Sequence, residues 1–163
     1  GYIAAKHLID RGCSRLAFFG DPKALVIGQR LEGCRDAMAE AGLSETLSVL
    51  PAHLVAEAAH PDIARYLGSV GERPQGIVAA SDVIAMSALR ALSEFGLAVP
   101  GDVHVIGYDG LAICEQTVPR LSTVSQDLTQ GAHHMVDMLL RRIAGEDTQS
   151  VVMEPQLIVR MSS

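Results

Sequence analysis

Apolar and polar residues alternate along the chain in two different spacings. In residues 29–41, Leu31, Cys34, Met38 and Ala41 recur at intervals of three and four, which places them on one face of a helix. Short unbroken apolar runs between turn residues predict buried strands instead. The predicted helices span residues 1–11, 29–41, 61–70, 82–95 and 127–143. The predicted strands span residues 16–19, 47–50, 76–80, 103–107, 121–126 and 151–159.

This alternation of helices and strands predicts an α/β fold, with a mainly parallel sheet and helices on both of its faces. In such sheets, ligands bind beyond the carboxyl ends of the strands, in the loops that lead into helices. Residues 20–30, Ser81-Asp82 and residues 108–114 occupy such loops. We therefore expect any binding site to be built from these three segments.

The composition is that of a folded domain of ordinary size, with 163 residues of which 48% are hydrophobic and 20% charged. A formal net charge of -6 argues against a broad nucleic-acid-binding surface, because non-specific affinity for phosphates comes from clustered Lys and Arg. No apolar run is long enough to predict a membrane span.

Three cysteines, Cys13, Cys34 and Cys114, are odd in number and widely spaced, unlike a disulfide framework or a metal site. They favour a reducing, cytoplasmic compartment. The first twelve residues lack the pattern of a secretory signal, and the chain starts without Met. We expect it to be a piece of a longer protein.

Residues 20–28 have the glycine spacing of a phosphate-binding loop, but Gln29-Arg30 replaces the Lys-Ser/Thr pair that should follow. Nucleotide binding is therefore not predicted. The segment instead presents Arg30 at the start of a helix. There its planar guanidinium can donate to carboxylates or vicinal hydroxyls, and the alternative is an ordinary surface arginine.

Two further segments have both a functional and a purely structural interpretation. Asp109 follows an apolar strand within Gly-Tyr-Asp-Gly, where it either accepts hydrogen bonds from a ligand or simply forms a turn. Ser81-Asp82 begins the helix 82–95, where Ser and Asp are common N-caps and one of the two can also face a crevice. That helix has an apolar arc wider than one sheet face requires, so it is buried either inside the chain or against a second subunit.

Patterns typical of catalysis are absent. His133 and His134 are adjacent and point about 100° apart on their helix, so they do not form a chelating pair. No HExxH, GxSxG or paired-carboxylate motif occurs. We predict no enzyme activity, no cofactor and no metal site.

Taken in order, the chain resembles the carboxy-terminal half of the lactose/galactose-repressor (LacI/GalR) family of bacterial transcriptional regulators. The most specific run is Gly-Leu-Ala-Val-Pro-Gly-Asp-Val at residues 96–103, continued by Ile-Gly-Tyr-Asp at 106–109 and Pro-Arg-Leu-Ser-Thr-Val at 119–124. Similar blocks occur at His-Leu-x-x-x-Gly (7–12), Arg-x-x-Gly-x-x-x-Ala (30–37) and Ala-Ser-Asp (80–82). The matches cover nearly the whole chain.

The resemblance implies a two-lobed sensor of the periplasmic-binding-protein-like type, of which this chain forms mostly one lobe. Residues 1–120 would be the carboxy-terminal lobe, 121–150 a crossover strand and a helix of the other lobe, and 151–163 the return. The family's helix-turn-helix DNA-binding domain would lie outside these residues. The apolar stripe of helix 127–143 would then lack its usual partner, so we predict that the isolated chain self-associates or swaps this helix.

By the same resemblance, a small-molecule effector, most commonly a sugar, would bind between the lobes of a cytoplasmic homodimer and control operator DNA binding allosterically. No membrane would be involved. The residues carried over to the site are Arg30 and Asp109 for effector hydroxyl or amine groups, with Ser81, Asp82 and Gln126 lining the crevice. The family often has Asn in place of Ser81 and an aromatic residue near His53. The alternatives are a solute-binding protein of a sugar transporter, which shares the fold, and a nucleotide-using enzyme.

Overall fold

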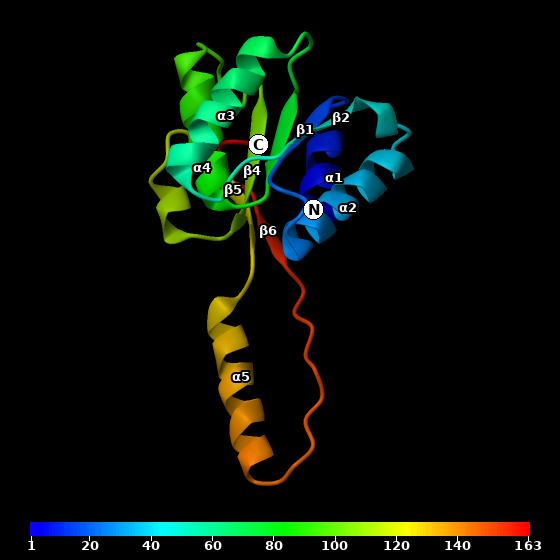
Figure 1. The fold of residues 1–163 in the computed structure, drawn as a ribbon, viewed down its shortest axis with the longest axis vertical. Helices are drawn as coiled ribbons and strands as arrows, with labels where there is room; N and C mark the ends of the chain where they lie inside the picture. The colour runs from blue at the N-terminus through cyan, green and yellow to red at the C-terminus, as the bar shows by residue number, and fades with distance from the viewer.

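The computed structural model describes all 163 residues, which form one six-stranded sheet of order β2-β1-β3-β4-β5-β6 (Figure 1). The strands are β1 (Leu16–Phe19), β2 (Leu47–Leu50), β3 (Gly76–Ala79), β4 (His104–Asp109), β5 (Ser122–Ser125) and β6 (Gln156–Ile158). The strands from β2 to β5 pair in parallel, and β6 pairs antiparallel to β5. The carboxyl ends of the five parallel strands therefore share one edge of the sheet.

The helices cover both faces of the sheet. They are α1 (Tyr2–Asp10), α2 (Leu25–Glu40), α3 (Ala56–Ser69), α4 (Asp82–Glu94) and α5 (Leu128–Ile143), with short 3-10 turns η1 (Ser44–Thr46) and η2 (Ala112–Glu115). α1 packs against α2, and α3 packs against α4 on the opposite side of the sheet (Figure 1). Right-handed connections require this division, since the chain moves one way from β1 to β2 and the other way from β2 through β3 to β4. The predicted α/β fold class is confirmed.

The core is centred on β1 and β3, in which every residue is buried. Because helices cover both faces, these strands have continuous apolar sequences instead of alternating ones. Phe18 and Phe19 are completely buried, and the edge of the Phe19 ring packs against the Tyr66 ring of α3 with centroids 5.4 Å apart. This packing gives the strand ends a rigid base.

Two helices begin earlier than the sequence predicts. α2 starts at Leu25, before the predicted residue 29, because only Ile27 of its first turn is buried and no helical period is visible there. α3 starts at Ala56, so the prediction that Pro61 begins this helix is wrong. Pro61 lies inside α3 on its exposed side, where water can satisfy the carbonyl that lacks an N–H partner.

The wide apolar arc of α4 is buried mostly inside the chain. α4 packs between α3 and the sheet, and Ile84, Ala88 and Leu92 are completely buried there. Of the two interpretations left open by the sequence, internal burial accounts for most of this arc.

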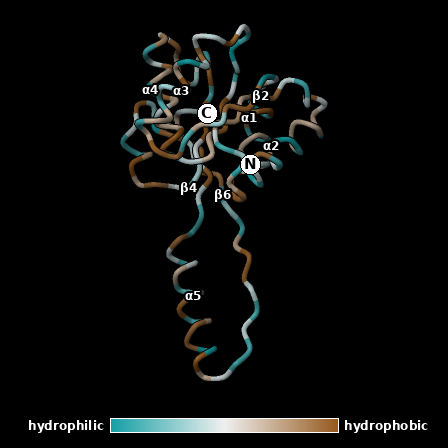
Figure 2. Tube along the Cα trace, in the orientation of Figure 1, coloured by the Kyte–Doolittle hydropathy of each residue, from teal (hydrophilic) through white to brown (hydrophobic).

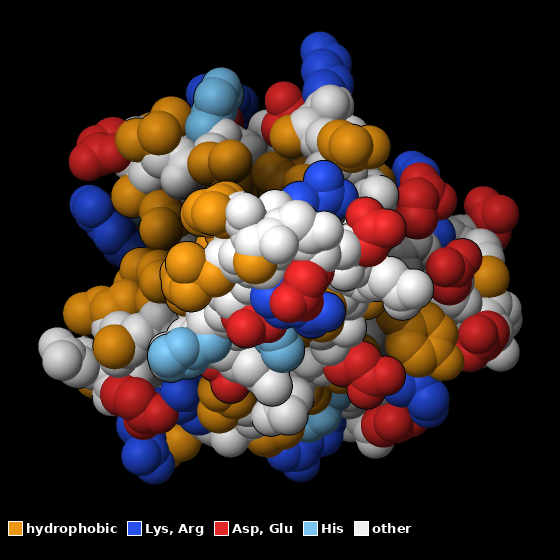
Figure 3. Space-filling model, turned by 90° about the horizontal axis from the view of Figure 1, so that it is seen from below, with side chains coloured by type: hydrophobic (Ala, Val, Ile, Leu, Met, Phe, Trp, Pro, Cys, Tyr) orange, Lys and Arg blue, Asp and Glu red, His pale blue; other side chains and the backbone are white.

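α5 stands apart from the rest of the molecule (Figure 1), connected to the sheet by β5 before it and β6 after it. None of its residues is buried. Brown apolar and teal polar positions alternate along it (Figure 2), and Leu128, Met135 and Ile143 are 67–74% exposed. Seen from this end of the molecule, apolar side chains gather on one part of the surface (Figure 3). That α5 belongs to another lobe stays a prediction, but its apolar face has no partner within these residues.

None of the helices combines the length and the apolar character that crossing a membrane requires.

Candidate functional site

Arg30 connects the carboxyl ends of two strands. Its guanidinium lies flat over the Tyr108 ring, with Cζ 3.6 Å from the ring centroid. Nη1 donates a hydrogen bond to the carbonyl of Ala80, just beyond β3, and Nη2 lies 3.9 Å from Oδ1 of Asp109 at the end of β4. The side chain is only 15% exposed, and its buried Nε has no partner. Arg30 is therefore a held, partly buried donor and not a mobile surface arginine.

Asp109 has a strained backbone, with φ at 118°, in the region that residues other than glycine rarely adopt. Such strain persists only where the surroundings enforce it, and it concentrates at functional sites. Burial raises the pKa of Asp109, and the nearby Arg30 guanidinium opposes part of that rise. The side chain of Asp109 is 35% exposed, so a ligand can reach its carboxylate.

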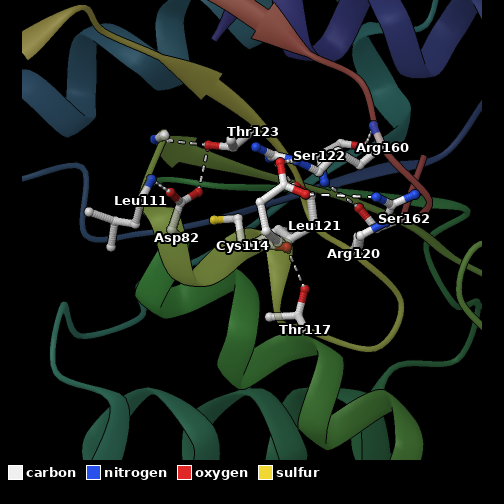
Figure 4. A network of polar contacts seen from close by, with 12 residues as sticks. Asp82, Leu111, Cys114, Thr117, Arg120, Leu121, Ser122, Thr123, Arg160 and Ser162 are labelled. Atoms are coloured by element: carbon white, nitrogen blue, oxygen red, sulfur yellow. Dashed lines mark hydrogen bonds and ion pairs between the residues drawn. The ribbon is translucent and has the colours of Figure 1, made fainter.

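A buried carboxylate holds the turn that follows Asp109 (Figure 4). Oδ2 of Asp82 accepts a hydrogen bond from the Leu111 amide at 2.7 Å, and Oδ1 accepts one from the Thr123 hydroxyl at 2.6 Å. Oγ1 of Thr123 in turn accepts a hydrogen bond from the Gly110 amide at 3.2 Å. These four residues come from three segments: Asp82 from α4, Gly110 and Leu111 from the turn after β4, and Thr123 from β5.

Gly107 makes this arrangement possible. It pairs with Thr123 across β4 and β5, and a Cβ at this position would lie 2.2 Å from Oδ1 of Asp82. Only glycine therefore leaves room for the Asp82 carboxylate between α4 and the sheet. This explains why a glycine stands two residues before Asp109.

Ser81 and Asp82 lie beneath the crevice. Ser81 is 7% exposed, and its hydroxyl accepts a hydrogen bond from the Ile84 amide, which confirms the N-cap interpretation. Asp82 is completely buried, with both carboxylate oxygens bonded within the chain. Its carboxylate reaches the crevice only through the turn that it holds.

A polar hollow of about 510 Å³ lies between the turn after β4, the start of α5 and the chain returning to β6. Of the five predicted site residues, Asp109 and Gln126 line it, and Arg30 adjoins it through Asp109. The other polar lining residues are Ser125, Asp127, Thr129, Gln130, Glu154 and Gln156. A second, more apolar hollow of about 450 Å³ lies between α5 and residues 150–155 and follows the uncovered face of that helix.

Sequence reasoning did not identify Tyr108 and Thr123 as part of the site. The position of Tyr108 beside Asp109 could have indicated it, because a guanidinium can stack on an aromatic ring at a strand end. Thr123 had a different signal: the run Ser122-Thr123 lies in a short strand between apolar residues, and buried hydroxyls need partners.

Comparisons with known proteins agree on one family. The family model described as periplasmic binding protein-like domain matches residues 5–163. The transcriptional repressor PurR of Edwardsiella ictaluri is 33% identical over 166 residues, which are 99% of this chain and 48% of the relative.

Two solved structures have the same fold. One is a complex of the transcriptional regulator CelR with cellobiose, at 32% identity and a TM-score of 0.86, covering 98% of this chain and 50% of that one. The other is a LacI-family regulator from Enterococcus faecium with bound ribose, at 25% identity and a TM-score of 0.90, covering 99% of this chain and 61% of that one. The chain spans about half the length of the curated relatives it matches.

Proposed function

The chain belongs to the periplasmic binding protein-like domain family of LacI-type transcriptional regulators, and from this premise we propose that it forms half of a small-molecule effector site. The observation that carries the proposal is the Arg30–Asp109 pair. A donor and an acceptor stand 3.9 Å apart at the carboxyl end of the sheet, beside a polar hollow. That edge is where ligands of parallel sheets bind.

The chemistry of the pair suits a neutral, hydroxyl-rich effector. Asp109 accepts hydrogen bonds from hydroxyl or amine groups, and the Arg30 guanidinium donates to their oxygens. Gln126, at the rim of the hollow, can do both. The solved relatives with cellobiose and with ribose support a sugar. Ser81 and Asp82 complete the proposed site by shaping it from below.

The regulatory part of the proposal follows from the family. The effector would bind between this lobe and a second one, favour one orientation of the two, and so change the affinity of a cytoplasmic homodimer for operator DNA. The DNA contact would be made by a separate helix-turn-helix domain. We propose binding and not catalysis, and the named relatives are repressors, not transport proteins.

The surface available for the homodimer is the outward side of α4. Its Met86 and Leu89 line a shallow hollow with Val118, which is 94% exposed. The charged residues Arg90 and Glu94 pair with each other beside it, at 3.0 Å. A negative charge introduced at Val118 (Val118→Glu) should weaken the dimer in analytical ultracentrifugation of the full-length protein.

The effector site is tested by thermal shift. The full-length protein is screened against cellobiose, ribose, nucleosides and sugar phosphates, together with Asp109→Ala and the control Asp36→Asn, an exposed residue of α2. We expect a stabilising sugar whose effect is lost in Asp109→Ala and kept in Asp36→Asn. A stabilising ligand that acts equally on Asp109→Ala would place the site elsewhere.

A further inference from the structure

Asp82 is a buried carboxylate that has no cation beside it. It is completely buried, and no Lys or Arg pairs with it. Its negative charge is stabilised by hydrogen bonds from the Leu111 amide and the Thr123 hydroxyl, and by its place in the first turn of α4. A carboxylate kept in the core in this way costs more to bury than a neutral side chain, so its role needs an explanation.

The groups bonded to Asp82 enclose Asp109. The Gly110 amide donates a hydrogen bond to Thr123. The Leu111 amide donates one to Asp82 (Figure 4). On the other side, Tyr108 carries the Arg30 guanidinium on its ring. The strained backbone of Asp109 is therefore held from both directions, and the glycine at 107 leaves the space that Asp82 occupies.

The thiol of Cys114 lies beside the same carboxylate (Figure 4). Burial, followed by a hydrogen bond to Asp82, raises the pKa of Cys114 to about 12. The thiol therefore stays protonated and adds no second negative charge beside Asp82. The groups around Asp82 come from three places along the chain: the turn after β4, η2 and β5.

We propose that Asp82 is a positioning residue, which holds the Asp109 carboxylate beside Arg30 and ties that conformation to the position of β5. The proposal rests on the function proposed above, in which Asp109 binds an effector. β5 leads directly into Gln126 and α5. A displacement of β5 by about 1 Å would stretch the Thr123–Asp82 hydrogen bond beyond bonding distance and release the turn.

Two pairs of variants test the proposal without any ligand. Thr123→Val removes the hydroxyl from a side chain of the same shape, and Thr123→Ser keeps it. Leu111→Pro removes the amide donor at a position whose φ of -64° suits proline, and Leu111→Ala keeps the amide. Each pair changes one bond to Asp82 and leaves its charge in place.

The measurement is the pKa of Asp109, followed by carboxyl ¹³C NMR in the full-length protein with labelled aspartate, alongside the unfolding temperature. Burial raises this pKa in the intact turn. Release of the turn in Thr123→Val and Leu111→Pro should lower it by about half a pH unit or more, and the Ser and Ala variants should keep it. The Leu111 pair decides the matter if Thr123→Val fails to fold.

An Asp109 pKa that is unchanged in the Thr123→Val and Leu111→Pro variants, with a lower unfolding temperature, would show that Asp82 only stabilises the fold. Because no effector is used, this failure differs from failure of the proposed function. A ligand screen without any hit would remove the sensor proposal and leave the positioning of Asp109 intact.

Discussion

Replacing Gly107 by Ala is the sharpest test of the packing beneath the site. The added Cβ would lie 2.2 Å from Oδ1 of Asp82 and 3.2 Å from Cβ of Ala85. Either α4 moves away from the sheet, or the Asp82 carboxylate rotates and gives up a hydrogen bond. Overpacking of a core costs about 1–3 kcal/mol. Loss of a hydrogen bond to a charged group costs about 1.5–3 kcal/mol.

Because one of these two responses is enough to relieve the clash, we expect a loss of about 1–3 kcal/mol in the free energy of unfolding. That is a large share of the ~5–15 kcal/mol that stabilises a typical domain. Urea unfolding followed by circular dichroism measures the loss, and Gly71→Ala is the matched control. Gly71 has no atom within 4 Å of its would-be Cβ, so it should change stability by less than about 0.5 kcal/mol. A loss below about 1 kcal/mol in Gly107→Ala would refute the proposed crowding around Asp82.

Three further outcomes follow from the structure. Asp109→Asn should raise the unfolding temperature of the ligand-free protein at pH 7, because a raised pKa means that the protonated form fits the fold better. Protonation of Asp109 stabilises the fold fully below the ordinary aspartate pKa, and this stabilisation is lost as the pH rises through the higher pKa of the folded protein. The Asn variant should therefore gain nothing near pH 3. An equal gain at that pH would point to relief of backbone strain instead. Cys34 and Cys114, whose pKa values burial raises to about 12, should resist iodoacetamide at pH 8 until urea unfolds the protein, as counted by mass spectrometry. The isolated chain should self-associate through α5, and Leu139→Glu, which changes a 60% exposed apolar residue, should shift it toward monomer in light scattering. A monomeric isolated chain with α5 still helical would contradict this.

The inner strands were predictable because the sheet is covered on both faces, whereas the strand predicted over residues 151–159 is wrong for 151–155, since β6 spans only Gln156–Ile158. Residues 76–79 and 16–19 are apolar throughout and end at turn residues, which is how a doubly covered parallel strand reads in sequence. The starts of α2 and α3 were not predictable from period alone. Leu25 and Val26 are apolar but exposed, so no buried face marks the first turn of α2. Pro61 looks like a helix start although it lies on the outer side of α3.

The site was only half visible in the sequence, for a physical reason. Arg30 and Asp109 could be predicted because Asp109 ends β4 and Arg30 lies in the segment that follows β1, and the carboxyl ends of parallel strands share one edge of the sheet. The direction of the Asp82 carboxylate could not. It depends on the register of β4 and β5, which sets Thr123 opposite Gly107, and no local pattern encodes that pairing. A Ser-Asp pair at the start of a helix has the same sequence whether its carboxylate faces the core or the solvent.

The position of β5 makes Asp109 sensitive to whatever α5 contacts. Thr123 donates a hydrogen bond to Asp82 and also pairs with Ile158 of β6. The strands that lead to α5 and return from it therefore meet at the residue that bonds Asp82. A hydrogen bond to a charged group contributes about 1.5–3 kcal/mol. Coupling between an effector and a second site is typically about 1–3 kcal/mol. Gain or loss of the single Thr123–Asp82 bond is therefore large enough to couple a displacement of β5 to the conformation of Asp109.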